Sequence, residues 1–347
     1  MSTIEDVARL AGVSRGSVSN VLSGRVRMGD AMRARVMAAA ETLGYRPNRL
    51  ASALATGRYS TVALLVPDIT NWVMSELSKA VEEVAHARHY TVTICNTDKR
   101  VSRERAHLEE LAGHRVGGLI AVAEGVAALE YRRLMDDGTR IVLVNNRVEG
   151  LDAPLVRFER EQAIKSALAR LSDGGRRRVG VLAPESTPAD GSRPDSAVAT
   201  SRLGVRSLVQ HCAEALGVEV VVDSRPMRSV ADGRAAMQAL RDLAAPPSAV
   251  FAASWPHTLG MLAVVNRMDT AQRRDLGLVG TGVAEYVDAV APWLSYVDLP
   301  AREQGRVAAE RLFLAIDDGD DGSPRECVIP VRLVERESLA SSAVAAS

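Results

Sequence analysis

Strand-like and helix-like segments alternate along most of the chain. Short runs of aliphatic and β-branched residues follow one another from residue 61 onward, separated by longer amphipathic stretches. The expected strands are 62–66, 91–95, 118–122, 140–144, 178–182, 218–222, 249–253 and 276–280. The expected helices are 72–88, 101–112, 126–136, 159–172, 201–216, 229–244 and 257–268. This alternation predicts an α/β fold of parallel, doubly wound sheets, and a break near 150–160 predicts two similar subdomains.

Length and composition are those of a water-soluble protein of more than one domain. The chain has 347 residues, of which 47% are hydrophobic and 25% charged. It lacks an apolar run of the roughly 18 to 20 residues that a membrane span needs, and its first residues form no secretory signal. Its 3 cysteines lie far apart, which suits a reducing compartment. We therefore expect a cytoplasmic protein with no membrane partner.

Charge is distributed unevenly along the chain although the net charge is zero. Residues 1–58 contain nine arginines and four acids, so they carry +5 and the remainder carries −5. A basic segment attached to an acidic body is typical of nucleic-acid binding. Lysine is scarce throughout, and arginine is correspondingly common everywhere, which weakens this indication.

The basic segment has the pattern of a helix-turn-helix. Thr3 and Asp6 fit the cap of a first helix, which Gly12 ends. Ser14 fits the cap of a second helix, and a third is expected from about 30 to 43, closed by Gly44. Helix, short glycine-containing turn and helix together predict a DNA-reading unit.

The second helix is the expected recognition helix. Its outward residues are Arg15, Gly16, Ser17, Ser19 and Asn20. Arginine can bond guanine with two hydrogen bonds, and asparagine can do the same with adenine. The alternative is a plain three-helix bundle in which these side chains are only solvated. The run 12–16 also matches a G-x-S-x-G nucleophile elbow, but a helix precedes it instead of a strand, so Ser14 is interpreted as a cap.

Three motifs resemble the LacI/GalR family of repressors. They are Thr3-Ile4-Glu5-Asp6-Val7-Ala8, then Gly12-Val13-Ser14 with Val18-Ser19-Asn20-Val21-Leu22-Ser23-Gly24, and then Tyr45-Arg46-Pro47-Asn48-Arg49-Leu50-Ala51-Ser52-Ala53-Leu54-Ala55. The resemblance continues to about residue 335. It implies a homodimer on double-stranded operator DNA, with a hinge helix that enters the minor groove and inserts Leu54 as a wedge.

The resemblance also implies which residues contact DNA. Thr3 would meet a phosphate; Arg15, Gly16 and Asn20 would face bases; Arg49 and Ala51 would lie by the minor groove. We add Ser14, Ser17 and Leu50 as neighbours of these positions. The family more often has arginine where this chain has Asn20, so the operator bases are expected to differ from the common pattern.

The family pattern further implies the domain organisation. We expect a helix-turn-helix domain at 1–46, a hinge at 47–59, a periplasmic-binding-protein-like core at 60–335 and a flexible tail at 336–347. The chain would cross between subdomains near 158, 291 and 323. The N-subdomain would comprise about 60–158 and 292–322, and the C-subdomain about 159–290 and 323–335. The tail has no leucine heptad, so no tetramer-forming coil is expected.

A small-molecule effector is expected in the cleft between the subdomains, at the carboxyl ends of the strands. Asp68, Asn71 and Trp72 follow the first strand, although Asp68 or Asn71 could equally cap a helix. The other candidates, taken from the resemblance, are Arg147, Ser201, Arg202, Trp255 and Gly282.

Several of these positions depart from the family. Counting back from Gly204 puts Ser201 at the usual arginine position, with Arg202 beside it. Trp255 and Gly282 stand where the family commonly has ligand-binding aspartates. Losing two carboxylates predicts an effector that is less polyhydroxylated or more apolar than a simple sugar. A simple sugar and a vestigial site without an effector are the alternatives.

An allosteric transcriptional repressor is the leading hypothesis for function. A periplasmic-type solute-binding protein would share the body's fold but not the basic head. A βα-type enzyme would need an acid–base or nucleophile constellation, which we do not find. His86, His89, His107 and His114 have no cysteine or carboxylate partners at zinc-like spacing, so neither metal nor cofactor is expected.

Overall fold

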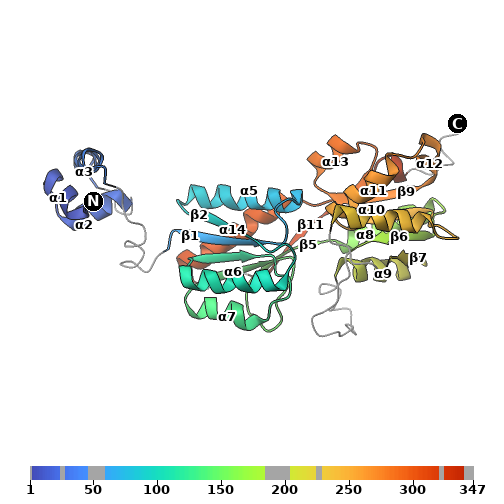
Figure 1. The fold of residues 1–347 in the computed structure, drawn as a ribbon, viewed down its shortest axis with the longest axis horizontal. Helices are drawn as coiled ribbons and strands as arrows, with labels where there is room; N and C mark the ends of the chain where they lie inside the picture. Colours follow the sequence, from blue (N-terminus) through green and yellow to red (C-terminus); the bar gives the residue numbers. More distant parts are fainter. Residues whose placement is uncertain are drawn as a thin grey trace. The chain divides into compact units, whose positions relative to one another are not determined.

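The chain forms two compact units in the computed structural model, Met1–Ser60 and Thr61–Ser347 (Figure 1). The structure describes residues 2–23, 28–45, 59–183, 204–223, 229–319 and 324–339. The second unit begins close to the expected start of the core at residue 60.

The first unit is a small bundle of helices α1 (Ile4–Ala11), α2 (Arg15–Ser23) and α3 (Asp30–Thr42). The Thr3 hydroxyl accepts from the Asp6 amide, and the Asp6 carboxylate accepts from the Thr3 amide, which forms the expected capping box. Gly12 ends α1 with φ 62°, a left-handed conformation that glycine adopts without strain. The predicted helix-turn-helix is therefore present.

The core of this unit is aliphatic. Val7, Val18 and Val36, one from each helix, are completely buried. Val21, Ala39 and Ala40 belong to the same cluster. These residues orient α2, so its opposite face points to solvent.

The N-subdomain of the second unit is a parallel sheet between two pairs of helices. The sheet order is β11-β5-β4-β3-β1-β2. Its strands are β1 (Thr61–Val66), β2 (Thr91–Asn96), β3 (Gly118–Ala121), β4 (Arg140–Val144), β5 (Leu155–Glu159) and β11 (Glu326–Pro330). Its helices are α5 (Trp72–Ala87), α6 (Val101–His114), α7 (Ala128–Asp136) and α14 (Ala301–Asp318).

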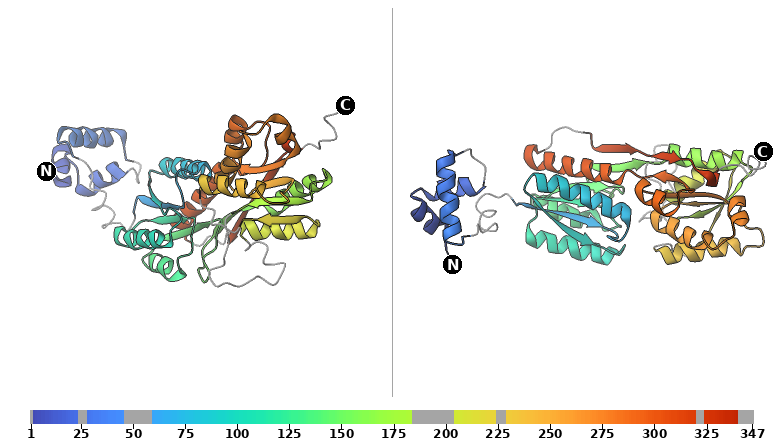
Figure 2. Two further views of the ribbon diagram at one scale, coloured as in Figure 1. Left: turned by 45° about the vertical axis from the view of Figure 1, so that its right-hand side comes forward. Right: turned by 90° about the horizontal axis from the view of Figure 1, so that it is seen from above.

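Both faces of this sheet are buried. Val62 and Leu64 of β1 belong to the cluster that includes Leu77 of α5 and Leu312 of α14. Ala63 and Leu65 point the other way, into the cluster formed with α6 and α7. Figures 1 and 2 show α5 and α14 side by side on one face and α6 and α7 on the other. This double coverage explains why β1 is a continuous apolar run.

The C-subdomain repeats this plan with sheet order β12-β10-β9-β8-β6-β7. Its strands are β6 (Arg178–Leu182), β7 (Glu219–Val222), β8 (Ala249–Ala252), β9 (Gly277–Gly282), β10 (Ser295–Asp298) and β12 (Arg332–Val334), the last antiparallel to β10. Its helices are α8 (Glu161–Asp173), α9 (Val205–Ala215), α10 (Val230–Arg241), α11 (Trp255–Val265), α12 (Thr270–Asp275), α13 (Ala284–Val290) and the 3₁₀ turn Glu337–Leu339.

Two crossings between the subdomains lie later than predicted. Strand β10 pairs with β9, so the second crossing falls at 299–300 and the prediction near 291 was too early. Strand β11 pairs with β5, so the third falls at 331 and not near 323. In each case the chain forms one more strand before it crosses, which moves the boundary about eight residues further along the chain.

The start of the predicted flexible tail is packed against the body. The Ser338 hydroxyl donates to the Leu278 carbonyl at 2.6 Å and accepts from the Ser295 amide at 2.8 Å. Leu339 is buried. The prediction of a free tail from 336 was therefore wrong up to residue 339, because this turn packs against strands β9 and β10 of the second sheet.

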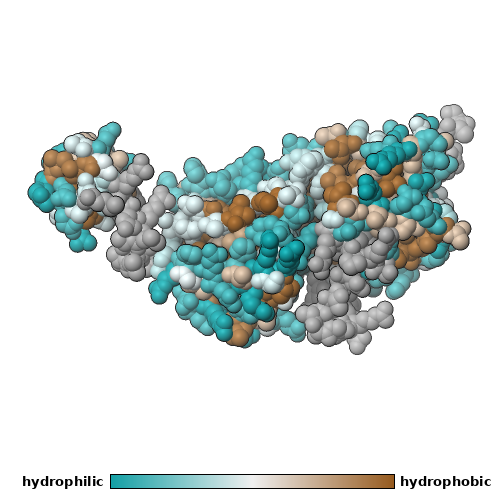
Figure 3. Space-filling view, viewed as in Figure 1, coloured by the Kyte–Doolittle hydropathy of each residue, from teal (hydrophilic) through white to brown (hydrophobic). Residues whose placement is uncertain are grey.

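The face of the body seen in Figure 3 is mostly hydrophilic, with small separate apolar patches. No helix in the described part of the chain is long and apolar enough to span a bilayer.

Candidate functional site

The solvent face of α2 carries the predicted base-reading side chains. Arg15, Gly16 and Asn20 are exposed, while Val18 between them is completely buried. Arg15 lies 3.2 Å from Glu5, with both side chains more than half exposed. Such a surface ion pair is worth little, so Arg15 can exchange it for another partner at small cost.

The other residues of the first unit that are predicted to contact DNA lie at the starts of helices. The Ser14 hydroxyl accepts from the Ser17 amide at 3.1 Å and lies 3.0 Å from the Ser17 hydroxyl. Hydrogen bonds from the amide and hydroxyl of Thr3 lower the pKa of Asp6. Thr3 and Ser14 therefore orient the two helices, whatever else they contact. The predicted hinge contacts Arg49, Leu50, Ala51 and Leu54 lie outside the described residues.

Asp68 and Asn71 shape the turn between β1 and α5. Asp68 accepts from the amide and hydroxyl of Thr70, at 3.0 and 2.6 Å, and its second oxygen lies 4.0 Å from the Lys99 ammonium. Asn71 caps α5 by accepting from the Val73 amide at 3.1 Å. The capping alternative thus describes what Asn71 does in this structure.

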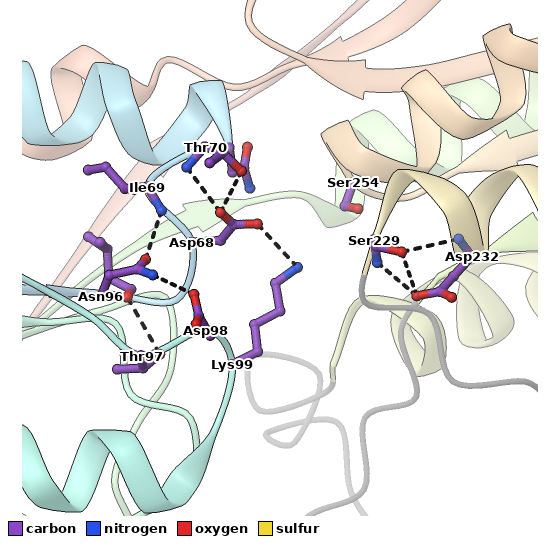
Figure 4. Close-up of polar contacts among 12 residues, drawn as sticks. Asp68, Ile69, Thr70, Asn96, Thr97, Asp98, Lys99, Ser229, Asp232 and Ser254 are labelled. Carbon is purple, nitrogen blue, oxygen red and sulfur yellow. Dashed lines mark hydrogen bonds and ion pairs between the residues drawn. The ribbon is translucent and has the colours of Figure 1, made fainter.

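Figure 4 shows what faces this turn. Asp68 and Lys99 lie on one side, and Ser254 and the Ser229–Asp232 capping box of the C-subdomain lie across from them. Polar groups of both subdomains therefore meet at the carboxyl ends of the strands, as doubly wound sheets require.

Aromatic rings join the two subdomains beside this turn. Trp72 of α5 stacks on Trp255 of α11, with centroids 5.2 Å apart, and contacts Tyr286 of α13 in a tilted arrangement, with centroids 4.1 Å apart. The Tyr286 hydroxyl also donates to Glu76 of α5 at 2.8 Å. The sequence pattern had not singled out Tyr286 or Glu76, because nothing in their spacing links two helices that lie about two hundred residues apart.

Arg147 lies just after β4 and is only half-exposed because it pairs with Glu326 at the start of β11. Glu326 also pairs with Arg157 of β5. Burial favours a higher pKa for Glu326, but hydrogen bonds and charge from Arg157 and Arg147 outweigh burial and lower it. Arg147 therefore reaches the edge strand of the first sheet.

A cavity of about 220 Å³ opens where the first crossing occurs. It is lined by residues that follow β4, by the end of β5 and by the first turns of α8 and α9. The lining residues are Asn145, Asn146, Arg157, Phe158, Glu159, Arg160, Glu161, Gly204, Val205 and Leu208. None of the predicted effector residues is among them. Ser201 and Arg202, which precede α9, lie outside the described residues.

Across the described ranges, no three or more His, Cys, Asp or Glu side chains are grouped as a metal site.

A helix-turn-helix unit joined to two parallel α/β subdomains that meet at a cleft defines a ligand-responsive DNA-binding regulator. Residues 3–48 match the family described as bacterial regulatory proteins of the lacI family, and residues 168–339 match a periplasmic binding protein-like domain. The chain belongs to the LacI family of transcriptional regulators, as full-length relatives also show.

The regulator PtxS of Pseudomonas aeruginosa is 30% identical over 338 residues, which cover 97% of this chain and 95% of PtxS. The regulator GalS of Salmonella typhimurium is 30% identical over 343 residues, which cover 98% and 97%. The lac repressor dimer bound to operator and the anti-inducer ONPF has the same fold, with a TM-score of 0.78, 18% identity and coverage of 97% and 99%.

Proposed function

We propose that this regulator is a repressor that binds a pseudo-palindromic operator as a homodimer, with α2 in the major groove. The observation that carries the proposal is the solvent face of α2, where Arg15 and Asn20 stand on a helix anchored by the buried Val18. A rigid helix with exposed arginine and asparagine suits direct readout of guanine and adenine.

The dimer follows from the symmetry of such sites, since two copies of α2 read two half-sites one helical turn apart. The lac repressor of similar fold is itself described as a dimer on its operator. The role of the hinge, including Arg49, Leu50, Ala51 and Leu54, stays a prediction from sequence. A DNA-binding protein of this kind works in the cytoplasm.

Control by a small molecule in the cleft is the second part of the proposal. Three crossings link the subdomains within the described residues, so a ligand held between them can change their relative arrangement. The predicted departure from a simple sugar gains support from Trp255 and Gly282, because the indole leaves little room for a polar group at either position.

Binding of the full-length chain to labelled DNA from upstream of its own gene tests the proposal. Fluorescence anisotropy with this DNA and with a scrambled duplex separates specific from nonspecific affinity. Arg15→Ala is expected to cost about 1–3 kcal/mol of specific affinity and to leave the scrambled duplex nearly unaffected. Arg33→Ala, an exposed arginine of α3, is the matched control. An equal loss of specific affinity in Arg15→Ala and Arg33→Ala would refute the proposal. So would a wild-type chain that shows no preference for the upstream DNA, and that result would favour a solute-binding protein.

A further inference from the structure

The cavity at the first crossing contains a half-buried cation, Arg160, that forms no ion pair within the described residues. Arg160 occupies the N-cap position of α8 and lines the cavity together with Arg157. Its guanidinium carbon lies 5.3 Å from the centre of the Phe158 ring. Its Nε is buried and has no hydrogen-bond partner, and no ion pair in the described part of the chain includes Arg160.

The electrostatic surroundings of Arg160 disfavour its charge. Burial, and then the charge of Arg157, lower its pKa to about 10. No carboxylate acts in the opposite direction. The group is still a cation at neutral pH, and a buried charge without a partner is costly. Such a cost is commonly retained where a ligand supplies the missing charge.

The acids of the cavity already have partners. Glu161 pairs with Lys165 at 2.8 Å. Glu159 accepts from the Glu161 amide at 2.8 Å and lies 3.8 Å from Arg157. Glu326, beside the cavity, serves both Arg147 and Arg157. None of these carboxylates forms an ion pair with Arg160, so the positive charge there is not neutralised within the described residues.

A second group of donors faces the same space. Helix α9 begins beside the cavity. Its N-cap residue is Gly204, so no side chain caps the first amides of the helix. The first amides of a helix and its dipole favour an anion.

We propose that this cavity binds the anionic group of the effector, a carboxylate or a phosphate, with Arg160 as its main cationic partner. The inference rests on the proposed function, because it names the chemical class of the ligand in the same cleft. A volume of about 220 Å³ fits a small organic acid or a phosphate ester. An anionic effector would differ in charge from the less polyhydroxylated or more apolar effector that the sequence predicts.

Isothermal titration of the full-length chain compares ligands that share one skeleton: D-glucose, D-gluconate and D-glucose 6-phosphate. Acetate and inorganic phosphate, at matched ionic strength, probe the charged group alone. Either D-gluconate or D-glucose 6-phosphate is expected to bind with measurable heat, and so is either acetate or inorganic phosphate. D-glucose is expected to bind at least about tenfold more weakly than the preferred sugar anion. Preference for gluconate and acetate would identify a carboxylate; preference for the two phosphates would identify a phosphate.

Arg160→Gln is expected to weaken anion binding at least about tenfold, and Arg160→Lys to weaken it less because the charge remains. Arg170→Gln, on the exposed face of the same helix, is the control and should bind as wild type. Binding of no anion by the wild type, equal binding by Arg160→Gln, or preference for D-glucose would overturn the inference. Operator affinity measured on the same samples separates this outcome from failure of the proposed function, since ligand-free Arg160→Gln should still bind DNA.

Discussion

The indole of Trp255 lies against Gly282 so closely that a Cβ on Gly282 would stand 2.6 Å from the ring. Trp255 is 2% exposed, and its other neighbour is Trp72 of the opposite subdomain. The two residues are therefore complementary in size: the large ring fills space that the missing side chain leaves. Sequence reasoning predicts that both positions differ from the family pattern, and this contact gives one physical reason for the two predicted differences.

Gly282→Ala is expected to destabilise the body by about 1–3 kcal/mol, because the new methyl group overpacks the contact with Trp255 and with Val287. Thermal unfolding followed by circular dichroism measures the effect. Gly113→Ala, in the exposed part of α6 with open space around it, is the control and should be neutral or stabilising. Combining Gly282→Ala with Trp255→Leu should recover part of the loss; strict additivity would mean that the two residues do not interact.

Tyr286→Phe is expected to weaken the contact between the subdomains by about 1 kcal/mol, since it removes the 2.8 Å hydrogen bond to Glu76. Trp72 and Trp255 should then become more solvated, and tryptophan emission should shift to longer wavelength. Tyr296→Phe is the matched control, because the Tyr296 hydroxyl donates to Asp288 within the C-subdomain. A similar emission shift in both variants would contradict a role of Tyr286 in joining the subdomains.

Stability should depend on pH through Glu104, whose side chain is completely buried under Tyr131. Burial raises its pKa above the ordinary value of 4.5, although hydrogen bonds from Tyr131 and from the Glu124 and Val126 amides partly oppose this. A raised pKa in the folded state means that the stabilising contribution is present below 4.5 and is lost as pH rises through the folded pKa.

Glu104→Gln cannot ionise, so its melting temperature relative to wild type should improve as pH rises from about 4.5 to 8. The variant keeps one side-chain oxygen, which can accept from the Glu124 and Val126 amides, so its stability should be close to that of wild type at the acid end, where Glu104 is protonated. Melting curves across this range provide the measurement. The melting temperature of the exposed Glu109→Gln variant, on the same helix, should change with pH in parallel with that of wild type. If the melting temperature of Glu104→Gln also followed wild type in parallel, Glu104 would be excluded as the titrating group.

Leu54→Ala is expected to weaken operator binding by more than about 1 kcal/mol while sparing random DNA, because a smaller side chain is a poorer wedge between base pairs. Anisotropy with the two duplexes checks this. An equal loss on random DNA would contradict a wedge and would point to a general defect of the head.

The local patterns of the head could be predicted from sequence. Thr3 with Asp6, Gly12 and Ser14 act within a few residues of themselves, so cap and turn chemistry alone predicts their positions. The apolar strands β1, β3 and β4 were equally clear, because both faces of each are buried and every residue is buried except Thr61 and Arg140 at the strand starts.

Other strands escaped sequence reasoning because part of each carries polar side chains. Strand β5 contains Arg157 and Glu159, and β11 begins with Glu326. Arg157 and Glu326 pair between β5 and the edge strand β11, so this pattern of charges is explained only once the two strands are paired. The crossings were misplaced for the same reason.

The sequence by itself determined the helix-turn-helix and the alternation of strand and helix, because these depend on periodicity and on short-range caps, and its motifs indicated the family by resemblance. Only the tertiary structure decided which side chains meet in the cleft. Trp72 with Tyr286, Trp255 with Gly282, and Arg160 with the start of α9 come together through sheet order and chain crossing. Contacts of that kind join distant segments, and no spacing along the chain encodes them.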